Sequence, residues 1–385
     1  MLIAFFSNYI NHHQVLVADE LYKLTNGNYY FIETIPLPEF RKKLGYSDYS
    51  TRKYIIQAWN DDDSYKKAEK ICLDADVALF GSVTVHNFQI QRAKARKLSF
   101  EVNERWLKRG LLNILSPRLL RNIFAYHTIF RKAPMYKLCC SAFTANDQYL
   151  MLSYKDKCFK WGYFTQVDNN YEKQLLNPKY DSSLFNTPKI MWCSRFLRWK
   201  HPELPIKMAA RLKKNGYNFV LNMYGSGHEE EDMKKLTYKL GVDDVVKFLG
   251  VLPNKEILEA MREHDIFLFT SDKREGWGAV ANEAMSNGCV LVGSDAIGSI
   301  PFLVKDLENG CIFKSCNVES LTEKVTWLID NPIERQKIAL NGYRTMRDIW
   351  SPENAAKNLL QLIDDILNGR KSSISEGPCS KALPI

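Results

Sequence analysis

The segment that decides the fold runs from Asp265 to Gly288. It reads Asp265-Ile-Phe-Leu-Phe-Thr270, then Ser271-Asp-Lys-Arg-Glu275-Gly-Trp-Gly278, then Ala-Val-Ala-Asn-Glu283-Ala-Met-Ser-Asn-Gly288. The first part is a short apolar run between polar residues, which is typical of a buried parallel strand. A glycine turn and a helical stretch of small residues follow. This order predicts an α/β fold in which backbone N–H groups and the helix dipole face an anion.

Two carboxylates, Glu275 and Glu283, lie in this segment. The first is in the turn and the second is two helical turns further along. A carboxylate accepts two hydrogen bonds and therefore suits a vicinal diol. A nucleotide-sugar, which carries phosphate between two diol-bearing sugars, would use the turn and both carboxylates. The alternative is that Glu275 caps the helix and Glu283 is an exposed helix residue, and the spacing alone does not decide between them.

Length and composition indicate an ordinary globular protein of about two domains. The chain has 385 residues, of which 45% are hydrophobic and 25% charged. It contains no run of about 18 apolar residues that would predict a membrane-spanning helix. Met1–Ser7 lacks a basic leader and a cleavage site, so we expect a first strand there. The nine cysteines are scattered without a Cys-x2-Cys pair, which fits reduced thiols in a cytoplasmic protein.

The net charge of +9 is concentrated in one segment. Between Arg92 and Lys137 there are twelve Lys and Arg residues against Glu101 and Glu104, interleaved with Leu, Ile and Trp106. This composition is typical of a helix at a membrane interface. The alternative is a pair of core-packed helices with a solvated basic face. So much Leu and Ile disfavours a nucleic-acid surface, which would use polar readers and base stacking.

Strand-like and helix-like segments alternate twice along the chain, which predicts two doubly wound α/β domains. The expected strands are Leu2–Phe6, Tyr29–Thr34, Val77–Gly81, Lys137–Ser141 and Gly162–Phe164, then Ile190–Ser194, Asn218–Tyr224, Val246–Leu249, Asp265–Phe269 and Val290–Gly293. We expect domains at residues 1–170 and 188–350, a linker at 171–187, a C-terminal helix at 351–368 and a disordered tail at 369–385.

Several further residues are candidates for binding. Arg195 and Lys200 follow an expected strand and could converge on a diphosphate, or they could be two solvated bases on a loop. The run Tyr224-Gly-Ser-Gly227 lacks the third glycine of a dinucleotide fingerprint and precedes four acidic residues, so we expect a tight turn lining a cleft.

In the first domain, Asn60-Asp-Asp-Asp63 is better explained as a helix N-cap than as a metal site. His12, His13 and His86 follow first-domain strands, where a cleft would open. No set of His, Cys and Asp residues has the spacing of a metal site, so we expect none.

Taken together, these motifs resemble glycosyltransferase family 4, the group 1 glycosyltransferases of GT-B fold. The likeness is sharpest from Lys189 to Trp350 and follows the order of the family. Its elements are Arg195-x4-Lys200, Tyr224-Gly-Ser-Gly227, Phe248-Leu-Gly250-Val-Leu, His264-Asp-Ile-Phe-Leu-Phe-Thr-Ser271, Glu275-Gly-Trp-Gly278 and Asn282-Glu-Ala-Met-Ser-Asn-Gly288. In the first domain, Asn103-Glu-Arg105, Trp161-Gly-Tyr-Phe164 and the loop Ser7–His13 resemble bacterial members that build surface polysaccharides.

The resemblance implies two Rossmann-like domains facing a central cleft, with the acceptor on the first domain and the nucleotide-sugar on the second. Arg195 and Lys200 would hold the donor diphosphate, and Glu283 would bind the ribose diol. Glu275 and the amides of Gly276, Trp277 and Gly278 would bind the donor sugar. Gly225, Gly227, Val251, His12 and His86 would complete the substrate contacts. The chain departs from the family where Asn11-His-His13 replaces a glycine pair and where His201 replaces a glycine after the lysine.

The function that the resemblance implies is a retaining hexosyltransferase that needs no metal ion or other cofactor. Its partners would be a nucleotide-sugar donor, a lipid-linked or saccharide acceptor, and the inner face of the cell membrane, where it would be a peripheral cytoplasmic enzyme of surface polysaccharide synthesis. A nucleotide-sugar epimerase of related fold is the enzymatic alternative, although it would not need the basic apolar segment. An inactive membrane-associated sugar-nucleotide-binding protein is the other alternative.

Overall fold

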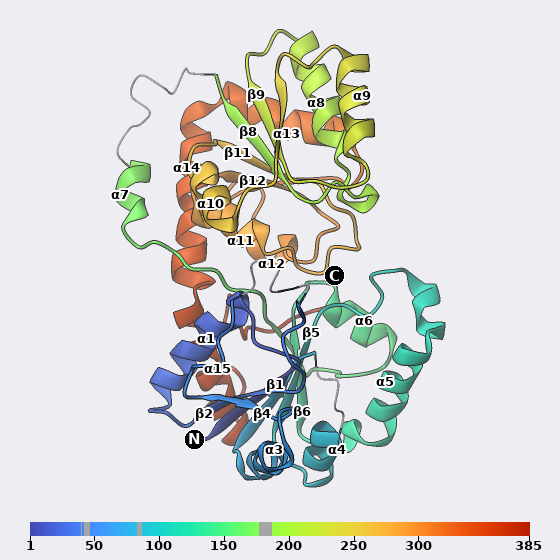
Figure 1. The fold of residues 1–385 in the computed structure, drawn as a ribbon, viewed down its shortest axis with the longest axis vertical. Helices are drawn as coiled ribbons and strands as arrows, with labels where there is room; N and C mark the ends of the chain where they lie inside the picture. Colours follow the sequence, from blue (N-terminus) through green and yellow to red (C-terminus); the bar gives the residue numbers. More distant parts are fainter. Residues whose placement is uncertain (40, 42–46, 83–86, 177–186) are drawn as a thin grey trace. The chain divides into compact units, whose positions relative to one another are not determined.

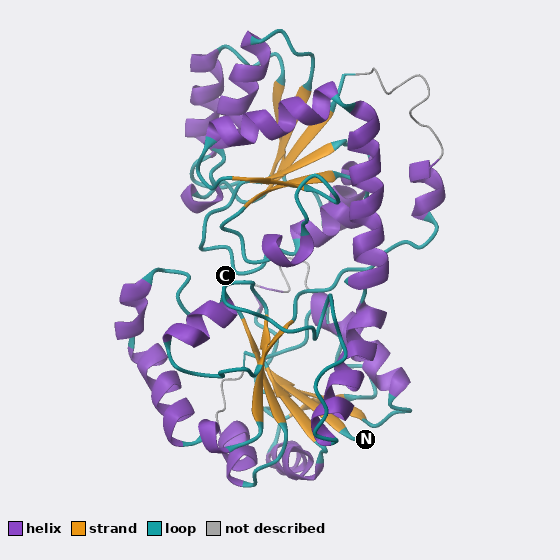
Figure 2. Ribbon diagram, turned by 180° about the vertical axis from the view of Figure 1, so that it is seen from behind, coloured by secondary structure: helices purple, strands orange, loops and turns teal. Residues whose placement is uncertain are grey.

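The chain divides into two compact units. The computed structural model describes residues 1–39, 41, 47–82, 87–176 and 187–385. The first unit comprises Met1–Thr165 and Ile349–Ile385, and the second comprises Gln166–Asp348. Each unit is a parallel sheet covered by helices (Figure 1, Figure 2). The doubly wound α/β class predicted from the alternation of strands and helices is confirmed.

The sheet of the first unit has the strand order β3-β2-β1-β4-β5-β6-β7, and neighbouring strands pair in parallel. Its strands are β1 (Ile3–Ser7), β2 (Tyr29–Glu33), β3 (Ile55–Gln57), β4 (Val77–Phe80), β5 (Ser99–Asn103), β6 (Met135–Cys139) and β7 (Cys158–Lys160). Every residue of β1 and β4 is buried. Strands covered on both faces need continuous apolar runs, and these two have them.

The helical elements of the first unit are α1 (His12–Leu24), α3 (Asp62–Asp74), α4 (Asn87–Lys94), η1 (Leu111–Leu115), α5 (Pro117–Thr128), η2 (Phe130–Lys132), α6 (Thr144–Leu150) and α15 (Pro352–Leu367). Four of them, α1, α3, α5 and α15, begin at a side chain that caps the N-terminus. Asp61 accepts a hydrogen bond from the Ser64 N–H at 2.7 Å, which confirms the N-cap predicted for this acidic run. Ser351 caps α15, which packs against α1 within the first unit.

The sheet of the second unit has the order β10-β9-β8-β11-β12-β13, again with parallel neighbours. Its strands are β8 (Lys189–Cys193), β9 (Val220–Tyr224), β10 (Val246–Gly250), β11 (Ile266–Phe269), β12 (Val290–Ser294) and β13 (Cys311–Phe313). The helical elements are α7 (Tyr171–Leu176), η3 (Arg198–Lys200), α8 (Glu203–Lys214), α9 (Glu230–Leu240), α10 (Asn254–Arg262), α11 (Val280–Ser286), α12 (Ile300–Leu303), α13 (Val318–Asp330), α14 (Pro332–Arg344) and η4 (Thr345–Ile349).

Some strand predictions are wrong. Gly162–Phe164 is not a strand, and the chain instead pairs with β6 slightly earlier, at β7. The expected basic helical region contains the strand β5, and β13 was not predicted either. These strands are short, and β5 lies in a charged stretch. Its pairing with β4 and β6, which local periodicity does not reveal, makes it a strand.

The expected linker and tail also need correction. Within 171–187, residues 177–186 lie outside the described residues, but Tyr171–Leu176 forms helix α7, and Tyr171 is buried against Tyr343. The tail is ordered where it meets the edge strand β7: Lys160 N–H donates to the Ser380 carbonyl at 2.8 Å, and Ala382 N–H to the Cys158 carbonyl at 3.1 Å. An edge strand has unpaired backbone groups, and the tail pairs with them despite its turn-rich composition.

Part of the basic segment is structural. The Arg92 side chain is fully buried, and its guanidinium donates to the carbonyls of Cys72, Ala75, Asp76 and Leu98 at 2.6 to 2.9 Å. Burial lowers the pKa of Arg92 to about 10. This base of α4 therefore binds backbone carbonyls at the end of α3 and just before β5, and it does not belong to a solvent-facing basic surface.

Two further bases of the segment are also held inside the unit. Lys137 is fully buried, lies 3.1 Å from a carboxylate oxygen of Glu101, and has its ammonium 4.5 Å from the ring centre of Trp106. Arg105 pairs with the buried carboxylate of Asp147 at 3.1 Å. Any surface role of the basic segment must rest on its other bases.

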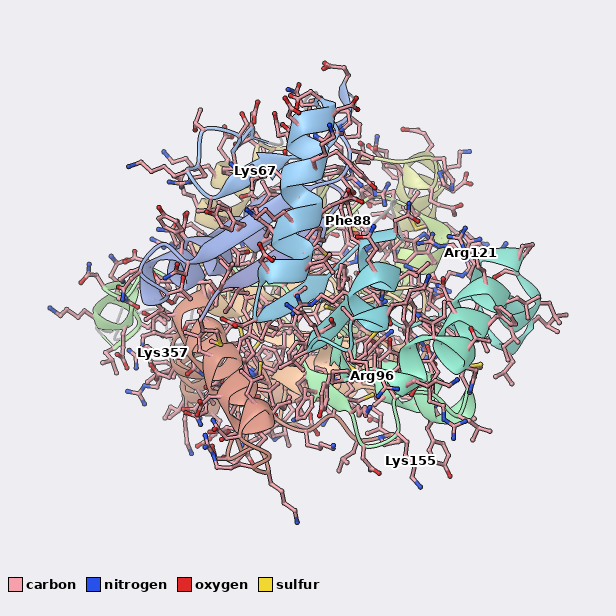
Figure 3. The ribbon with its side chains drawn as sticks, turned by 90° about the horizontal axis from the view of Figure 1, so that it is seen from below. Lys67, Phe88, Arg96, Arg121, Lys155 and Lys357 are labelled. Carbon is pink, nitrogen blue, oxygen red and sulfur yellow. The ribbon has the colours of Figure 1, made fainter. Side chains whose placement is uncertain are left out.

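Arg92→Met should destabilise the first unit by about 3 kcal/mol, because the change leaves several buried carbonyls without a donor. Arg96→Met is the matched control, since Arg96 is exposed just after the same helix and is labelled in Figure 3. Chemical denaturation of both variants measures the difference. Equal stability of the two would contradict a structural role for the Arg92 guanidinium.

Candidate active site

The residues predicted to bind the nucleotide-sugar donor lie close to the point where the strand order of the second sheet reverses. β8 and β11 are neighbours, with Ile190 opposite Ile266 and Met191 opposite Phe267. From β8 the chain moves outward to β9 and β10, and it then returns to β11 on the other side. Ligands of doubly wound sheets bind beyond the carboxyl ends of strands at such a switch point. The loops that follow β8 and β11 are therefore the first place to look for a site.

Lys200 and Glu275, one from each of these loops, form an ion pair in the structure. Each side chain is only 12% exposed, and the Ser271 hydroxyl donates to the same carboxylate oxygen at 3.0 Å. The Lys200 ammonium also lies 4.2 Å from the ring centre of Trp199. The fold thus brings together two of the three residues, Arg195, Lys200 and Glu275, that were predicted to bind the diphosphate and sugar of the donor. Arg195, the third, is exposed in the same loop as Lys200.

A hydrogen-bond chain that the sequence did not reveal fixes the two loops to each other. Trp192 Nε1 donates to the Thr270 hydroxyl at 2.9 Å, and this hydroxyl donates to the Lys200 carbonyl at 2.7 Å. The Asp272 N–H donates to the Trp199 carbonyl at 3.0 Å. Thr270 stands at the polar end of an apolar strand, and that position was the one available signal for its role.

The loop after β9 closes tightly on the loop after β8. Gly225 has φ +124°, and a Cβ atom added there would lie 1.9 Å from the Ser194 carbonyl oxygen, so only glycine fits. The Phe196 N–H donates to the Ser226 carbonyl at 2.9 Å, beside Gly227. The run is a loop packed closely against the loop after β8, and the turn comes one residue later, where the Glu230 N–H donates to the Gly227 carbonyl at 3.1 Å.

The turn Gly276-Trp-Gly278 is anchored by its tryptophan. Trp277 is fully buried, and its Nε1 donates to Asn282 at 2.8 Å. Gly278 has φ +78°, and an added Cβ would lie 2.2 Å from a ring atom of Phe269. The tryptophan ring is thus part of the core, and only backbone atoms of the turn are left to play the sugar-binding role predicted for it.

Glu283 lies in α11 near the end of β8. Its carboxylate accepts a long hydrogen bond of 3.3 Å from Asn254, which begins α10 at the end of the loop after β10 and which the sequence did not single out. Burial raises the pKa of Glu283. Burial, and then the nearby charge of Glu283, raise the pKa of the Cys193 thiol to about 12. Val251, also in the loop after β10, is 68% exposed. The partly buried carboxylate thus retains capacity for further donors.

The first-unit histidines lie together at the start of α1. The rings of His12 and His13 are 3.9 Å apart, and His13 stacks on Tyr163 at 5.6 Å with an interplanar angle of 8°. Burial lowers the pKa of His12, and burial with the charge of His12 lowers the pKa of His13 to about 3. Both imidazoles are therefore neutral at pH 7 and offer hydrogen bonds rather than charge. His86 lies outside the described residues.

Among the residues that the structure describes, no three His, Cys, Asp or Glu side chains are arranged to hold a metal ion.

The chain is similar in sequence to known glycosyltransferases. Residues 181–345 match the family model described as glycosyl transferases group 1. An uncharacterized glycosyltransferase of Haemophilus influenzae is 24% identical over 267 residues, covering 68% of this chain and 67% of that protein. The lipopolysaccharide core biosynthesis glycosyltransferase LpsE of Rhizobium meliloti is 27% identical over 179 residues, covering 46% of this chain. The chain spans about half the length of LpsE, at 50%.

The fold is shared with solved structures. Anabaena HepE in complex with UDP has a TM-score of 0.65 at 16% identity, with 96% of this chain and 100% of that chain covered. The two Rossmann-like units define the GT-B class, as predicted. Within it, the segment similar to the group 1 glycosyltransferases, residues 181–345, lies inside the second unit and contains the clustered motifs.

The pKa of Glu283 generates a test of its burial. The folded protein binds a proton at Glu283 more tightly than the unfolded chain does. The folded state therefore loses stability as pH rises from the unfolded pKa of Glu283 through its raised folded pKa. Glu283→Gln should therefore raise the unfolding temperature at neutral pH and weaken binding of a nucleoside diphosphate. Thermal unfolding and calorimetric titration measure the two effects.

The control for this change is Glu259→Gln, because Glu259 is exposed on the neighbouring helix α10 and is 4.0 Å from its lysine partner. We expect the control to alter neither quantity. An unfolding temperature that falls in Glu283→Gln, with affinity unchanged, would count against both the burial argument and the ligand role.

Proposed function

We propose that this protein is a retaining glycosyltransferase that moves a hexose from a nucleotide-sugar to a lipid-linked or saccharide acceptor. The observation that carries the proposal is the contact between Lys200 and Glu275 at the switch point between β8 and β11. A buried base and a carboxylate from separate loops suit a ligand that has a diphosphate beside sugar hydroxyls. Glu283 lies in α11, the helix that follows the Glu275 loop, and its carboxylate suits the ribose diol.

Lys200 would change partner when the donor binds. Its ammonium is paired with Glu275. A diphosphate carries more negative charge than one carboxylate, so it should draw the ammonium towards itself and free Glu275 for the hydroxyl groups of the sugar. Arg195 is exposed in the same loop and can approach the phosphates from solvent. Lys200 and Glu275 would thus exchange their mutual ion pair for contacts with the donor.

The chemistry follows from this charge arrangement. The bond between the anomeric carbon and the diphosphate oxygen breaks, and the sugar passes through an oxocarbenium-like state. Lys200 and Arg195 stabilise the charge that develops on the departing diphosphate, so in the proposed route these cations perform the task that a metal ion performs elsewhere. The acceptor oxygen attacks from the same face, and its proton passes to the departing phosphate. Configuration at the anomeric carbon is retained.

The donor and acceptor are proposed from the relatives. HepE was solved with UDP, and LpsE is named as a glycosyltransferase of lipopolysaccharide core biosynthesis. Uridine nucleotides are therefore the first donors to test, within a panel of nucleotide-sugars. Production of free nucleoside diphosphate only with an acceptor would support transfer. Conversion of the donor sugar without an acceptor would instead indicate an epimerase.

The first unit would meet the membrane through an amphipathic surface, which we define as the exposed residues of η1, α5 and their flanks. Its large apolar side chains are Leu111, Leu112, Leu115, Leu120 and Phe124, which are 47 to 83% exposed. Its exposed bases are Arg109, Arg118, Arg121, Arg131 and Lys132. Figure 3 shows α5 with Arg121 at the rim of the first unit. Apolar side chains ringed by bases suit an anionic lipid surface.

This surface supports a peripheral location at the cytoplasmic face of the membrane, where a lipid-linked acceptor would be reached. None of the described helices has the length and apolarity needed to cross a bilayer. Within α5, Leu119 and Tyr126 face the core, whereas Leu120 and Phe124 face outward. The helix thus packs on the sheet through one side and keeps an apolar side for another partner.

The leaving-group role predicts a large kinetic effect of Arg195→Ala. Turnover should fall by about a factor of 10² to 10³, by analogy with the loss of one donor to a developing negative charge. Folding should be almost unchanged because the side chain is exposed. Arg198→Ala, an exposed arginine of η3, is the matched control and should keep most of the activity. Wild-type turnover of Arg195→Ala would remove Arg195 from the mechanism.

The membrane role predicts that binding to anionic vesicles falls steeply with salt, because each base near the surface contributes about 1 kcal/mol through a screened potential. Arg118, Arg121 and Lys132, all changed to Glu, should release the protein from vesicles and leave binding of nucleoside diphosphate unaltered. We choose these bases and not Arg105, because the latter is paired with buried Asp147.

The matched control changes three exposed lysines of α3, Lys66, Lys67 and Lys70, to Glu and so alters the net charge equally. Sedimentation with anionic and neutral vesicles at two salt concentrations compares the variants. Equal release by both triple variants would indicate a net-charge effect, and absence of binding by the wild type would contradict the membrane role.

A further inference from the structure

His201 directly follows Lys200 and occupies a left-handed backbone conformation, with φ +50° and ψ +55°. Non-glycine residues adopt this conformation at a cost in free energy that glycine avoids. Its imidazole makes polar contacts with three separate parts of the second unit. Nδ1 lies 2.9 Å from Glu203 Oε1 at the start of α8, and Nε2 lies 3.7 Å from Asp272 Oδ2 in the loop after β11. The third contact is Cys316 Sγ, 3.4 Å from Nε2.

The charges around this imidazole favour its protonated form. Glu203 and Asp272 are both partly buried, at 27% and 22% exposure, and one imidazolium between them compensates their repulsion. The hydrogen bond to Glu203 is the largest cause that raises the pKa of His201. The positive charge of Lys207 on α8 favours the ionised form of Glu203, and the Arg274 side chain lies 4.0 Å from the Asp272 carboxylate. Cys316, after β13, is an exposed thiol.

The position of the imidazole links it to the proposed donor site. Lys200 is joined to the loop after β11 through its carbonyl, which accepts from Thr270, and through its ammonium, which contacts Glu275. His201 adds a further contact to the same loop, through Asp272. Without the imidazolium, Asp272 would lose this positive partner, and the contact between the two loops would weaken.

We propose that the His201 imidazolium is a positioning residue that holds the Lys200 loop against the loop after β11 and keeps Lys200 available to the donor diphosphate. The inference rests on the proposed function, because it assigns a supporting residue to the same site. It also accounts for a histidine at a backbone position that suits glycine. The bridge to Glu203 and Asp272 compensates for the strained conformation.

The proposal predicts a pH dependence with a defined sign. Because the pKa of His201 is raised in the folded protein, the bridge is fully present below the pKa of an unfolded histidine and is lost as pH rises through the folded pKa. The Michaelis constant for the nucleotide-sugar should therefore increase at alkaline pH. We expect an increase of about two- to fivefold, the usual effect of one partly exposed ion pair. The turnover number should change less.

Two variants of His201 distinguish the effect of its positive charge from the effect of its backbone conformation. His201→Gly fits the left-handed conformation and removes the charge, so its Michaelis constant should be raised at every pH and should lack the pH-dependent step. His201→Arg keeps a permanent positive charge, so its Michaelis constant should stay low across the same pH range. His228→Gln, which removes a 69% exposed histidine of the same unit, is the matched control and should retain the wild-type profile.

Steady-state kinetics from mildly acidic to mildly alkaline pH measure the Michaelis constant of each variant. Calorimetric titration measures the affinity for the nucleoside diphosphate. A His201→Gly variant with the wild-type pH profile would overturn the inference and leave the proposed function intact. A low and pH-independent Michaelis constant in His201→Gly would overturn it as well. A wild-type protein with no affinity for any nucleoside diphosphate would overturn the proposed function, and this inference with it.

Discussion

The parallel pairing of β8 with β11 is the constraint on which the candidate site depends. It places the carboxyl ends of two strands side by side although they are far apart in the chain, with β9 and β10 lying on the other side of β8. The loops that follow must then share one small region, and Lys200 meets Glu275 there. The close approach of Gly225 to Ser194 brings the loop after β9 to the same place. The site is thus a consequence of strand order.

Charge is balanced within this region before any ligand arrives. Lys200 is neutralised by Glu275, His201 lies between two carboxylates, and Glu283 is disfavoured as an anion by its burial. Burying a charge without a partner of opposite sign costs free energy. The charged residues of such a site therefore pair with one another, and a charged ligand can later replace these pairs. A ligand that carries both phosphate and hydroxyl groups could take over these pairings one by one. This gives a physical reason for a metal-free site in the proposed mechanism.

The first unit separates structural bases from surface bases. Arg92 and Lys137 are fully buried and satisfy backbone carbonyls or a carboxylate inside the sheet-and-helix core. The bases around η1 and α5 remain exposed beside large apolar side chains. A composition count treats all twelve bases alike. Only the exposed subset can contribute to the proposed contact with an anionic membrane, so this subset determines which variants test it.

The sequence by itself determined the α/β class, most strands of the second sheet and the order of the motifs, because apolar periodicity and glycine turns are local signals. Only the tertiary structure decided that Lys200 pairs with Glu275, 75 residues away, and that Arg92 is buried. The same holds for the strand β5 and for the ordered tail on β7, which local composition wrongly indicated as helical and disordered. Each of these depends on a partner distant in the chain. Hydrogen bonds and burial supplied by such a partner override local propensity.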